Sequence, residues 1–390
     1  MECNAMDGLR KIFRFNARVL DERTPPGFID ALKGRKAAEG GKFPARSLDV
    51  ALSGEAGDLL RNQGVPFEHG AGGIVARFDS DMIERLRRGS ACHELCAAVE
   101  QAFQGWSRNL YSWKVGRGRI VELGGKPKVM GILNITPDSF SDGGLFLPEE
   151  AAVAHAEKML AAGAEIIDVG GESTRPGAEE VTAAEEIERT AGVIRCIHER
   201  TNALISIDTT KAEVASAALD AGASIINDIS GLAFDGQMIP LAARRKAGVV
   251  IMHIQGRPRT MQDEPMYDDT LAEVALYLRN RAVAAMEGGI DADGIVLDPG
   301  IGFGKRFEDN LSILSGLGEL RSLGFPLLLG CSRKSFLGRI SRKEAEERSL
   351  ETAVTSVLAA MAGIQVVRVH DVHENRLALK VTETILRESR

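Results

Sequence analysis

The sequence predicts an α/β fold: a (β/α)8 barrel of the TIM type over residues 116–390, preceded by a small α/β N-terminal extension over residues 1–115. From about residue 128 onward, eight short apolar runs alternate with longer amphipathic stretches, and eight strand–helix units are what a closed barrel requires. The runs are apolar without interruption, which is typical of parallel strands that are covered on both faces. Each run also ends in a side chain capable of binding or catalysis.

The predicted strands are short and rich in β-branched residues. They cover residues 128–136, 165–171, 203–209, 224–230, 248–254, 294–300, 326–332 and 365–371. The predicted helices cover about 149–163, 182–200, 210–221, 236–246, 268–288, 308–323, 345–362 and 374–388. An open doubly wound sheet is the alternative, but it gives no reason for a count of eight. It also predicts a glycine-rich phosphate turn after the first strand, and "NITPDSFSDGG" does not have that pattern.

Polar side chains end all eight predicted strands. They are Asn134, Asp168, Asp208, Asn227 with Asp228, His253, Asp298, Lys334, and Arg368 with His370. Helix N-caps also favour Asp and Asn, but Lys, Arg and His are poor N-caps, so capping does not explain the whole set. Because the carboxyl ends of all the strands of a barrel meet at one rim, we expect a functional site there.

The rim carries groups of both signs. The acceptors are Asp168, Asp208, Asn227 and Asp298, and the cationic or donor groups are Lys334, Arg368 and His370. Clustered acceptors suit a ligand edge with several N–H groups, whereas the cations suit a phosphate or a carboxylate. The pattern therefore predicts a substrate with an amide-like heterocycle at one end and a phosphate at the other.

Bulk composition excludes several classes of protein. The chain has 390 residues, is 44% apolar and carries a net charge of −7, which argues against a general nucleic-acid binder. Its five cysteines form an odd, scattered set that suits a reducing compartment. The N-terminus lacks the apolar core of a signal peptide, and no apolar run reaches the roughly 18 residues of a membrane span. We expect a cytoplasmic protein without nucleic-acid or membrane partners.

The N-terminal extension does not share the strand–helix rhythm. It contains a strand-like "KIFRFNARVL", a glycine- and lysine-rich linker (34–42), a helical segment (50–64), a short strand "GIVARF" and a helix near 80–104. Residues 117–131 are typical of a hairpin that closes the bottom of the barrel. Cys92, His93 and Cys96 lie together, but no second pair follows at zinc-finger spacing. We expect an accessory domain that packs on the barrel or helps assembly.

Eight sequence motifs follow one another in the barrel. They read "GILNITPDSFSDGG", "IDVGGESTRPGA", "ISIDTTKAEVA", "INDISG", "IMHIQGRPRTMQ", "LDPGIGFGK", "GCSRKSFLG" and "RVHDV". In this order they resemble the signatures of the dihydropteroate synthase family, pterin-binding barrels of folate biosynthesis. The resemblance implies condensation of 6-hydroxymethyl-7,8-dihydropterin pyrophosphate with p-aminobenzoate, which yields 7,8-dihydropteroate and releases pyrophosphate.

The resemblance also implies roles at the pterin. The residues concerned are Asp208, Asn227, Met252, Asp298, Arg333 and Lys334. Asp208, Asn227 and Asp298 would accept hydrogen bonds from the ring, and Lys334 would reach the ring from the opposite side. Met252 would line the slot, and Arg333 would stack or pair beside it.

Further implied roles concern the other two groups of the reaction. Arg368 and His370 would hold the pyrophosphate, with Asn134 giving an oxygen ligand to Mg²⁺. The p-aminobenzoate pocket would be formed by Thr174, Pro176, Phe303, Lys334 and Ser335, and Arg175 in the second loop adds another cation for substrate binding. The implied chemistry is dissociative: pyrophosphate leaves first, and the aniline nitrogen traps a pterin-methylene cation. Asp208, Lys334, Arg368 and His370 would then be the catalytic residues, with Asp208 offsetting the developing positive charge.

Several interpretations stay open at this point. A pterin-dependent methyltransferase would share the pterin residues but would not need "SRKS", and no corrinoid-binding D-x-H-x-x-G follows. A non-catalytic pterin-binding barrel is expected to lose part of the rim set. Asp168 and Glu172 either organise the loop or touch substrate, and His253 is interpreted as a packed histidine that shapes the rim. By resemblance, a homodimer is expected to form through the late outer helices.

Overall fold

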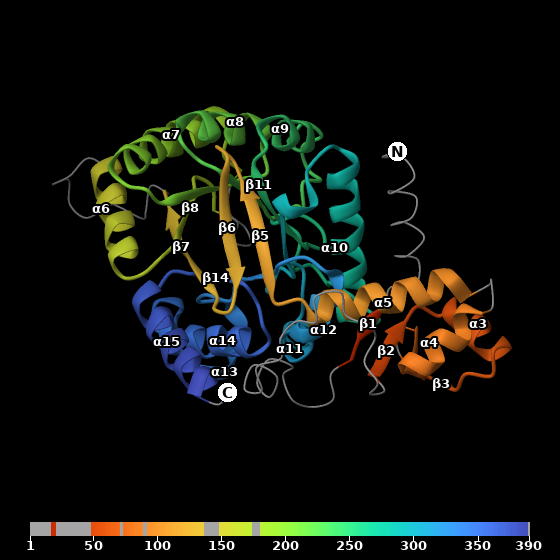
Figure 1. Ribbon diagram of the computed structural model, residues 1–390. Coiled ribbons are helices and arrows are strands. Elements are labelled where there is room, and N and C mark those ends of the chain that lie inside the picture. The colour runs from red at the N-terminus through yellow and green to blue at the C-terminus, as the bar shows by residue number, and fades with distance from the viewer. Residues whose placement is uncertain are drawn as a thin grey trace.

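The computed structural model describes residues 17–20, 48–70, 73–88, 92–135, 148–173 and 180–388. Figure 1 shows a barrel ringed by helices, with a smaller domain beside it. The predicted linker (34–42) lies outside the described residues, and so does most of the strand-like segment before Ala17.

Eight parallel strands form the barrel, in the order β12-β11-β10-β9-β8-β7-β14-β13. Their bounds are β7 Lys128–Asn134, β8 Ile166–Gly170, β9 Leu204–Asp208, β10 Ile225–Asp228, β11 Gly248–Met252, β12 Ile295–Asp298, β13 Leu328–Leu329 and β14 Val366–Val369. A parallel bridge between Leu297 and Leu327 joins the first strand of this order to the last and closes the barrel. Each strand lies within its predicted range, so the predicted fold is confirmed.

Helices cover the outside of the barrel (Figure 1). They are α6 Pro148–Ala161, α7 Ala183–Arg200, α8 Ala212–Ala221, α9 Met238–Arg245, α10 Thr270–Glu287, α11 Phe307–Ser315, α12 Leu317–Leu320, α13 Ser335–Ser341, α14 Ser349–Met361 and α15 Val372–Glu388. Short 3₁₀ turns are η2 Ala292–Gly294, η3 Arg321–Leu323 and η4 Ala345–Glu347.

Two helices differ from the prediction. The single helix expected over 308–323 is interrupted at Gly316, where a Cβ would lie 2.4 Å from the Leu271 side chain of α10. This glycine lets α11 end in close contact with α10. The short helix α13 was not predicted, and it begins directly after Lys334, which occupies its N-cap position.

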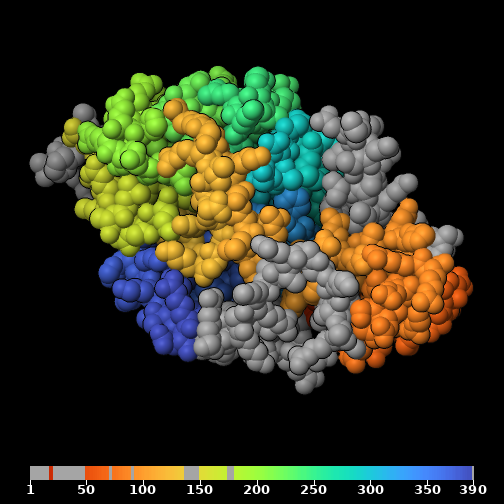
Figure 2. All heavy atoms as spheres, viewed as in Figure 1, coloured from red at the N-terminus to blue at the C-terminus, as the bar shows by residue number. Residues whose placement is uncertain are grey.

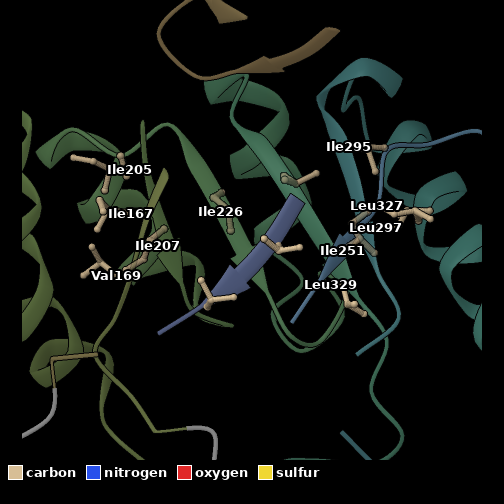
Figure 3. Packing of buried hydrophobic residues seen from close by; sticks show 14 of the residues in the cluster. Ile167, Val169, Ile205, Ile207, Ile226, Ile251, Ile295, Leu297, Leu327 and Leu329 are labelled. Atoms are coloured by element: carbon tan, nitrogen blue, oxygen red, sulfur yellow. The ribbon is translucent and has the colours of Figure 1, made fainter. Parts of the chain in front are cut away.

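The outward faces of the strands form the main hydrophobic core with the surrounding helices. Figure 3 shows part of it, with Ile205 and Ile207 of β9, Ile251 of β11 and Leu297 of β12 among the labelled residues. The inward faces of the strands carry a second apolar layer at the amino-terminal end of the barrel. Both faces of each strand are therefore buried, which explains why the sequence shows continuous rather than alternating apolar runs.

A hairpin closes the amino-terminal end of the barrel. It consists of β5 Leu110–Val115 and β6 Arg119–Gly124, and Figures 1 and 2 show it lying across this end. Its apolar residues pack on one inward side chain from each barrel strand: Met130, Ile166, Leu204, Ile225, Val250, Val296, Leu328 and Val366. The fully buried indole of Trp113 donates a hydrogen bond of 2.9 Å to the carbonyl of Gly294. The hairpin predicted over 117–131 is thus present, but it starts earlier in the chain.

The N-terminal domain contains an antiparallel sheet in the order β1-β2-β4-β3. Its elements are β1 Arg18–Val19, β2 Leu48–Leu52, α3 Ala56–Asn62, β3 Phe67–Gly70, β4 Gly73–Phe78, α4 Ser80–Arg87 and α5 His93–Ser107. The segment predicted as helical over 50–64 begins instead as β2, because its pairing with β4 outweighs its helix propensity. The helix predicted near 80–104 is two helices.

The N-terminal domain packs directly on the barrel. Arg18 pairs with Glu319 at 2.9 Å and with Asp269 at 3.6 Å. On α5, a Cβ at Gly105 would lie 2.7 Å from the backbone nitrogen of Gly324, so only a glycine permits this approach. Among the described residues, no helix is long and apolar enough to cross a membrane.

Candidate active site

A polar layer follows the apolar layer inside the barrel. Side chains alternate along a strand, so the residues two positions after the apolar layer also face inward. They are Ile132, Asp168, Ser206, Asn227, Met252, Asp298, Gly330 and Arg368. The next inward positions include Asn134, Asp208, Ser332 and His370. Seven of the predicted rim residues are thus brought together in two adjacent layers. Asp228 and His253 are not, because they lie two residues after the outward-facing Ile226 and Ile251 and contact Ser230 and Lys305 instead.

Arg368 is the centre of this arrangement. Its guanidinium donates to Asp168 Oδ2 and to Asp208 Oδ2, each at 2.6 Å. Asn227 Nδ2 donates to the same Asp168 oxygen at 2.9 Å. Burial alone would lower the pKa of Arg368, but the two carboxylates outweigh burial and hold the pKa above its usual value. The second oxygen of Asp168 is buried and has no hydrogen-bond partner within the described part of the chain.

The carboxyl groups outnumber the cations in this layer. Burial raises the pKa of Asp208 to about 7, because nearby Asp168 adds to the effect and Arg368 only partly opposes it. Burial also raises the pKa of Asp298 to about 6, although its carboxylate accepts a 2.7 Å hydrogen bond from the backbone of Gly300. Carboxyl groups of raised basicity at the base of a pocket suit a ligand that presents several N–H groups.

Lys334 lies at the opposite side of the site from β9 and β10. Its ammonium donates to the carbonyl of Ile301 at 2.6 Å and lies 3.9 Å from the centroid of the Phe303 ring. Burial lowers the pKa of Lys334 to about 8, with Asp298 opposing the shift. Phe303 itself packs on an apolar cluster that includes Met252 and Met261. An aromatic ring beside a cation can contact a flat, electron-rich ligand on its face.

Two glycines leave room between these side chains. A Cβ at Gly330 would lie 3.9 Å from Asp298 Oδ2 and 3.9 Å from Arg368 Cβ, within the polar layer. A Cβ at Gly170 would lie 3.5 Å from Asn134 Oδ1 and 3.6 Å from Asp208 Cβ. Asn134 and Asp208 therefore flank Gly170, and the missing side chains leave space for a ligand between the strands.

Asn134 is the predicted magnesium ligand. The described residues contain no group of three or more His, Cys, Asp or Glu side chains that could hold a metal by themselves. Asn134 is exposed at the mouth of the barrel, beside Asp208. Mg²⁺ prefers oxygen ligands, keeps several waters and often binds through one or two side chains together with substrate phosphates. The oxygens here fit an ion that arrives with a phosphate.

Other predicted residues lie around this centre. His370 Nδ1 is 2.9 Å from Ser332 Oγ, which also accepts a hydrogen bond from the His370 backbone. Arg333 makes a bidentate pair with Asp371, at 3.0 and 2.6 Å, and so has a protein partner. Ser335 is exposed at the first position of α13. The predicted residues Thr174, Arg175 and Pro176 lie outside the described residues.

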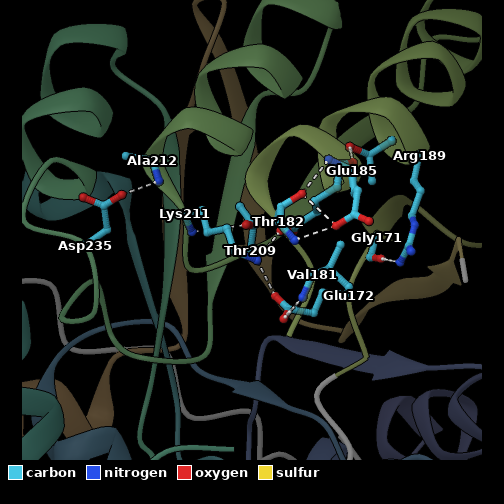
Figure 4. A network of polar contacts seen from close by, with 12 residues as sticks. Gly171, Glu172, Val181, Thr182, Glu185, Arg189, Thr209, Lys211, Ala212 and Asp235 are labelled. Carbon is cyan, nitrogen blue, oxygen red and sulfur yellow. Dashed lines mark hydrogen bonds and ion pairs between the residues drawn. The ribbon is translucent and has the colours of Figure 1, made fainter. Parts of the chain in front are cut away.

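The structure assigns contacts to residues whose roles the sequence left open. Asp168 is the shared acceptor of Arg368 and Asn227, and its inward position follows from its place two residues after Ile166. Glu172 accepts from the backbone of Val181 at 3.1 Å and from Lys211 at 2.6 Å, which ties together the two ends of the second loop (Figure 4). Glu172 therefore contacts loop atoms rather than the barrel centre.

Comparison with known proteins assigns the chain to a family. Residues 130–370 match the family model of pterin binding enzymes. The dihydropteroate synthase of Synechocystis sp. is 46% identical over 269 residues, which cover 69% of this chain and 93% of that protein. This chain belongs to the dihydropteroate synthase family. The relatives named in the comparison are dihydropteroate synthases, so the resemblance identified from the motifs is confirmed.

Solved structures of the family share the barrel. The Xanthomonas albilineans dihydropteroate synthase with 4-aminobenzoic acid matches with a TM-score of 0.66 at 42% identity, covering 70% of this chain and 98% of that one. The same enzyme in complex with 7,8-dihydropteroate gives a TM-score of 0.63 at 40% identity, covering 69% and 96%. The match thus spans nearly all of each dihydropteroate synthase and about two thirds of this chain.

Proposed function

We propose that this chain is a dihydropteroate synthase that joins 6-hydroxymethyl-7,8-dihydropterin pyrophosphate to p-aminobenzoate and releases pyrophosphate. The observation that carries the proposal is the buried cluster in which Arg368 bridges Asp168 and Asp208 beside Asn227. A relative that binds pterin without turnover would not need this cation among the acceptors. The chain also keeps Lys334 and Asp298 in the same site.

The pterin ring binds at the level of the polar layer. Asp298, Asn227 and Asp208 accept its N–H groups, and Lys334 donates to the ring from the opposite side. Met252 lines the slot, and Arg333 lies at its edge. The room left by Gly330 admits the flat ring next to Asp298 and Arg368.

Pyrophosphate departs at the mouth of the barrel. Arg368 and His370 hold the leaving group. Asn134 would hold Mg²⁺ through its side-chain oxygen, and the ion would neutralise charge on the phosphates. Loss of pyrophosphate leaves positive charge on the pterin methylene. Asp208 lies within the site and offsets this charge, and no covalent bond to the protein is required.

The aniline nitrogen of p-aminobenzoate then forms the new C–N bond. Phe303 provides a face for the aromatic ring, and Lys334 and Ser335 lie where its carboxylate is received. Thr174 and Pro176, which lie outside the described residues, are assigned to the same pocket by the family resemblance alone, and Arg175 is assigned to substrate binding on the same ground. The aniline nitrogen loses its proton as the bond forms, which yields 7,8-dihydropteroate.

Two exposed apolar stripes support a homodimer. Leu350, Val354 and Leu358 recur every four residues on α14, and Leu377, Val381 and Ile385 recur likewise on α15. The two helices pack side by side, so the stripes lie on neighbouring surfaces. Sedimentation of a Val354→Glu/Val381→Glu variant is the test. We expect the wild type as a dimer and the variant as a monomer, and a monomeric wild type would refute the interface.

The protein is proposed to be located in the cytoplasm. The N-terminal extension (1–115) is proposed as an accessory domain that stabilises the barrel. Its support is the packing of Arg18 on Glu319 and of Gly105 on Gly324. A truncation should remove residues 1–107, because β5 pairs with β6 beneath the barrel. We expect a lower melting temperature. A truncated protein that is equally stable and active would exclude the structural role.

The function itself is tested by product formation. Purified protein is incubated with the pterin pyrophosphate and Mg²⁺, with and without p-aminobenzoate, beside a Lys334→Ala variant. We expect dihydropteroate from the wild type and at least a hundredfold lower kcat/KM in the variant. Tight pterin binding without product would favour the non-catalytic alternative, and methyl transfer from a methylated pterin would favour the methyltransferase.

A further inference from the structure

The segment Gly300–Lys305 is held at almost every peptide. Four consecutive carbonyls, those of Ile301, Gly302, Phe303 and Gly304, accept hydrogen bonds of 2.6, 2.8, 3.0 and 2.6 Å from side chains. The donors are, in the same order, Lys334, Gln262, Lys305 and Tyr267. The backbone nitrogen of Gly302 also donates to Asn310 at 2.6 Å. Such a segment has one conformation, set by several elements at once.

Three glycines make this conformation accessible. Gly300, Gly302 and Gly304 have φ angles of 66°, 80° and 58°, which side-chain-bearing residues rarely adopt. A Cβ at Gly300 would lie 1.9 Å from the carbonyl oxygen of His253, and one at Gly304 would lie 2.3 Å from that of Gln255. The segment therefore lies backbone against backbone on the residues that follow β11.

Lys305 is the buried residue at the end of the segment. Its side chain is only 3% exposed, and its amine is 2.8 Å from His253 Nδ1 and 3.0 Å from the carbonyl oxygen of Phe303. No carboxylate pairs with it within the described part of the chain. Burial lowers its pKa well below the usual value and lowers that of His253 to about 2, so the imidazole is neutral. A buried amine with only neutral partners costs stability, which fits a functional rather than a structural requirement.

We propose that Lys305 is a positioning residue that ties the end of β11 to the segment Gly300–Lys305, so that the Phe303 ring is held where the arylamine substrate binds. The inference rests on the proposed function. Lys305 does not touch substrate in this account; it acts through the carbonyl of Phe303 and the ring of His253.

The contacts of Phe303 show why its placement matters. The ring lies 3.9 Å from the ammonium of Lys334 and packs on Met252, Ile254 and Met261. Met252, which lines the proposed pterin slot, ends β11 one residue before His253, but its pairing with Asp298 of β12 holds it without the amine. Two of the three pterin acceptors, Asp208 and Asn227, lie on other strands, β9 and β10. The third, Asp298, accepts from the backbone of Gly300 at the far end of the segment from Lys305. Loss of the Lys305 amine should therefore affect the arylamine more than the pterin.

The experiment compares Lys305→Met with the wild type and with Lys158→Met, an exposed control on α6. We expect the KM for p-aminobenzoate to rise about tenfold in Lys305→Met, because two buried partners lose their hydrogen bonds. The KM for the pterin pyrophosphate should stay within about twofold. Hydrogen exchange of a peptide covering residues 300–306 should be at least tenfold faster, with exchange in the barrel strands unchanged.

Two substitutions of His253 separate positioning from general packing. His253→Asn places an oxygen near the position of Nδ1 and should keep the p-aminobenzoate KM within about threefold of the wild type. His253→Leu should behave like Lys305→Met, and the double variant should show no further increase, because both changes break the same contact.

Three outcomes would overturn the inference: an equal rise of both KM values, faster exchange throughout the barrel, or no change in either measurement. If the wild type forms no dihydropteroate, the proposed function fails instead. The exchange comparison then still decides whether Lys305 holds the segment, since it needs no turnover.

Discussion

The two ends of the barrel are built from the same strands but differ in chemistry. At the closed end, the eight inward residues are all apolar and pack on the hairpin β5–β6. Two residues further along, the inward set includes Asp168, Asn227, Asp298 and Arg368. At roughly 3.3 Å per residue, these layers lie about 7 Å apart. Two residues along each strand therefore separate the apolar packing layer from the layer that contains the polar site residues.

The protein gains stability at its closed end and gives stability up at its open end. The closed end buries Trp113 and apolar side chains, which favour folding. The open end buries carboxyl groups whose pKa values are raised and an Asp168 oxygen without a described partner, which oppose folding. Substitutions at the closed end should then change stability alone, whereas substitutions at the open end should change activity, whatever they do to stability.

Arg368→Met is expected to have the largest effect. The variant leaves Asp168 and Asp208 buried without their shared cation, and breaking such a pair costs about 3–5 kcal/mol of folding stability. It also removes the pyrophosphate contact, so kcat/KM should fall at least a thousandfold. Activity assays and urea unfolding measure both effects. Arg368→Lys is the matched control, and it should recover more of the lost stability than of the lost activity. Equal recovery of stability and activity would contradict the difference between the two ends.

Trp113→Ala tests the closed end. A fully buried indole is lost together with its hydrogen bond to Gly294, and such truncations cost about 3–5 kcal/mol. Both KM values should stay unchanged for the folded fraction, since the hairpin lies away from the site. Chemical denaturation and steady-state kinetics at low temperature check this. A raised KM for either substrate would contradict the separation.

Asp298→Asn also tests the open end, but this substitution is expected to raise the folding stability rather than lower it. The pKa of Asp298 rises from 3.8 to about 6 on folding, so its contribution to stability is present at low pH and is lost as pH rises toward 6. The variant carries no such penalty and should be more stable than the wild type by about 3 kcal/mol at pH 8, but not at pH 4. It should also be inactive. Unfolding at the two pH values provides the measurement, and a pH-independent difference would disprove the assignment.

Gly330→Ala should give the smallest change in stability, and the contrast between its effect on stability and its effect on substrate binding should be the sharpest. The added methyl would meet only ordinary contacts of 3.9 Å with Arg368 and Asp298, so stability should change by less than about 0.5 kcal/mol. Because the methyl enters the polar layer, the KM for the pterin pyrophosphate should rise several-fold. Calorimetry and kinetics together test this, and an unchanged KM would show that the ring binds elsewhere.

The barrel could be predicted from sequence because its signal is local and repeated. Each strand is a continuous apolar run, and each ends in a residue that projects at the rim, such as Asp208 or Asp298. Other features depend on distant partners. The pairing of Arg333 with Asp371 spans 38 residues, and β2 is a strand because it pairs with both β1 and β4. The helix α13 is short and contains Gly338, which weakens its helical signal.

Asp168 shows the same limit within the site itself. Its inward direction follows from alternation, and this signal is present in the sequence. Its partners Asn227 and Arg368 lie 59 and 200 residues away, and only the closed barrel places them together. The contacts of Lys305 are likewise invisible in the string "GIGFGK", where a lysine after glycines suggests an exposed loop.

The hairpin at the closed end also determines how ligands reach the site. Since β5 and β6 seal that end, ligands enter and leave through the mouth alone. The pterin level at Asn227 lies deeper than Ser335, which is exposed at the mouth. In a site with a single opening, the ligand that binds deeper has to bind first. We therefore expect the heterocycle to bind before the arylamine, which then covers it. Under the proposed function, we therefore expect ordered addition of the substrates, and the two strands that close the far end of the barrel contribute to that order.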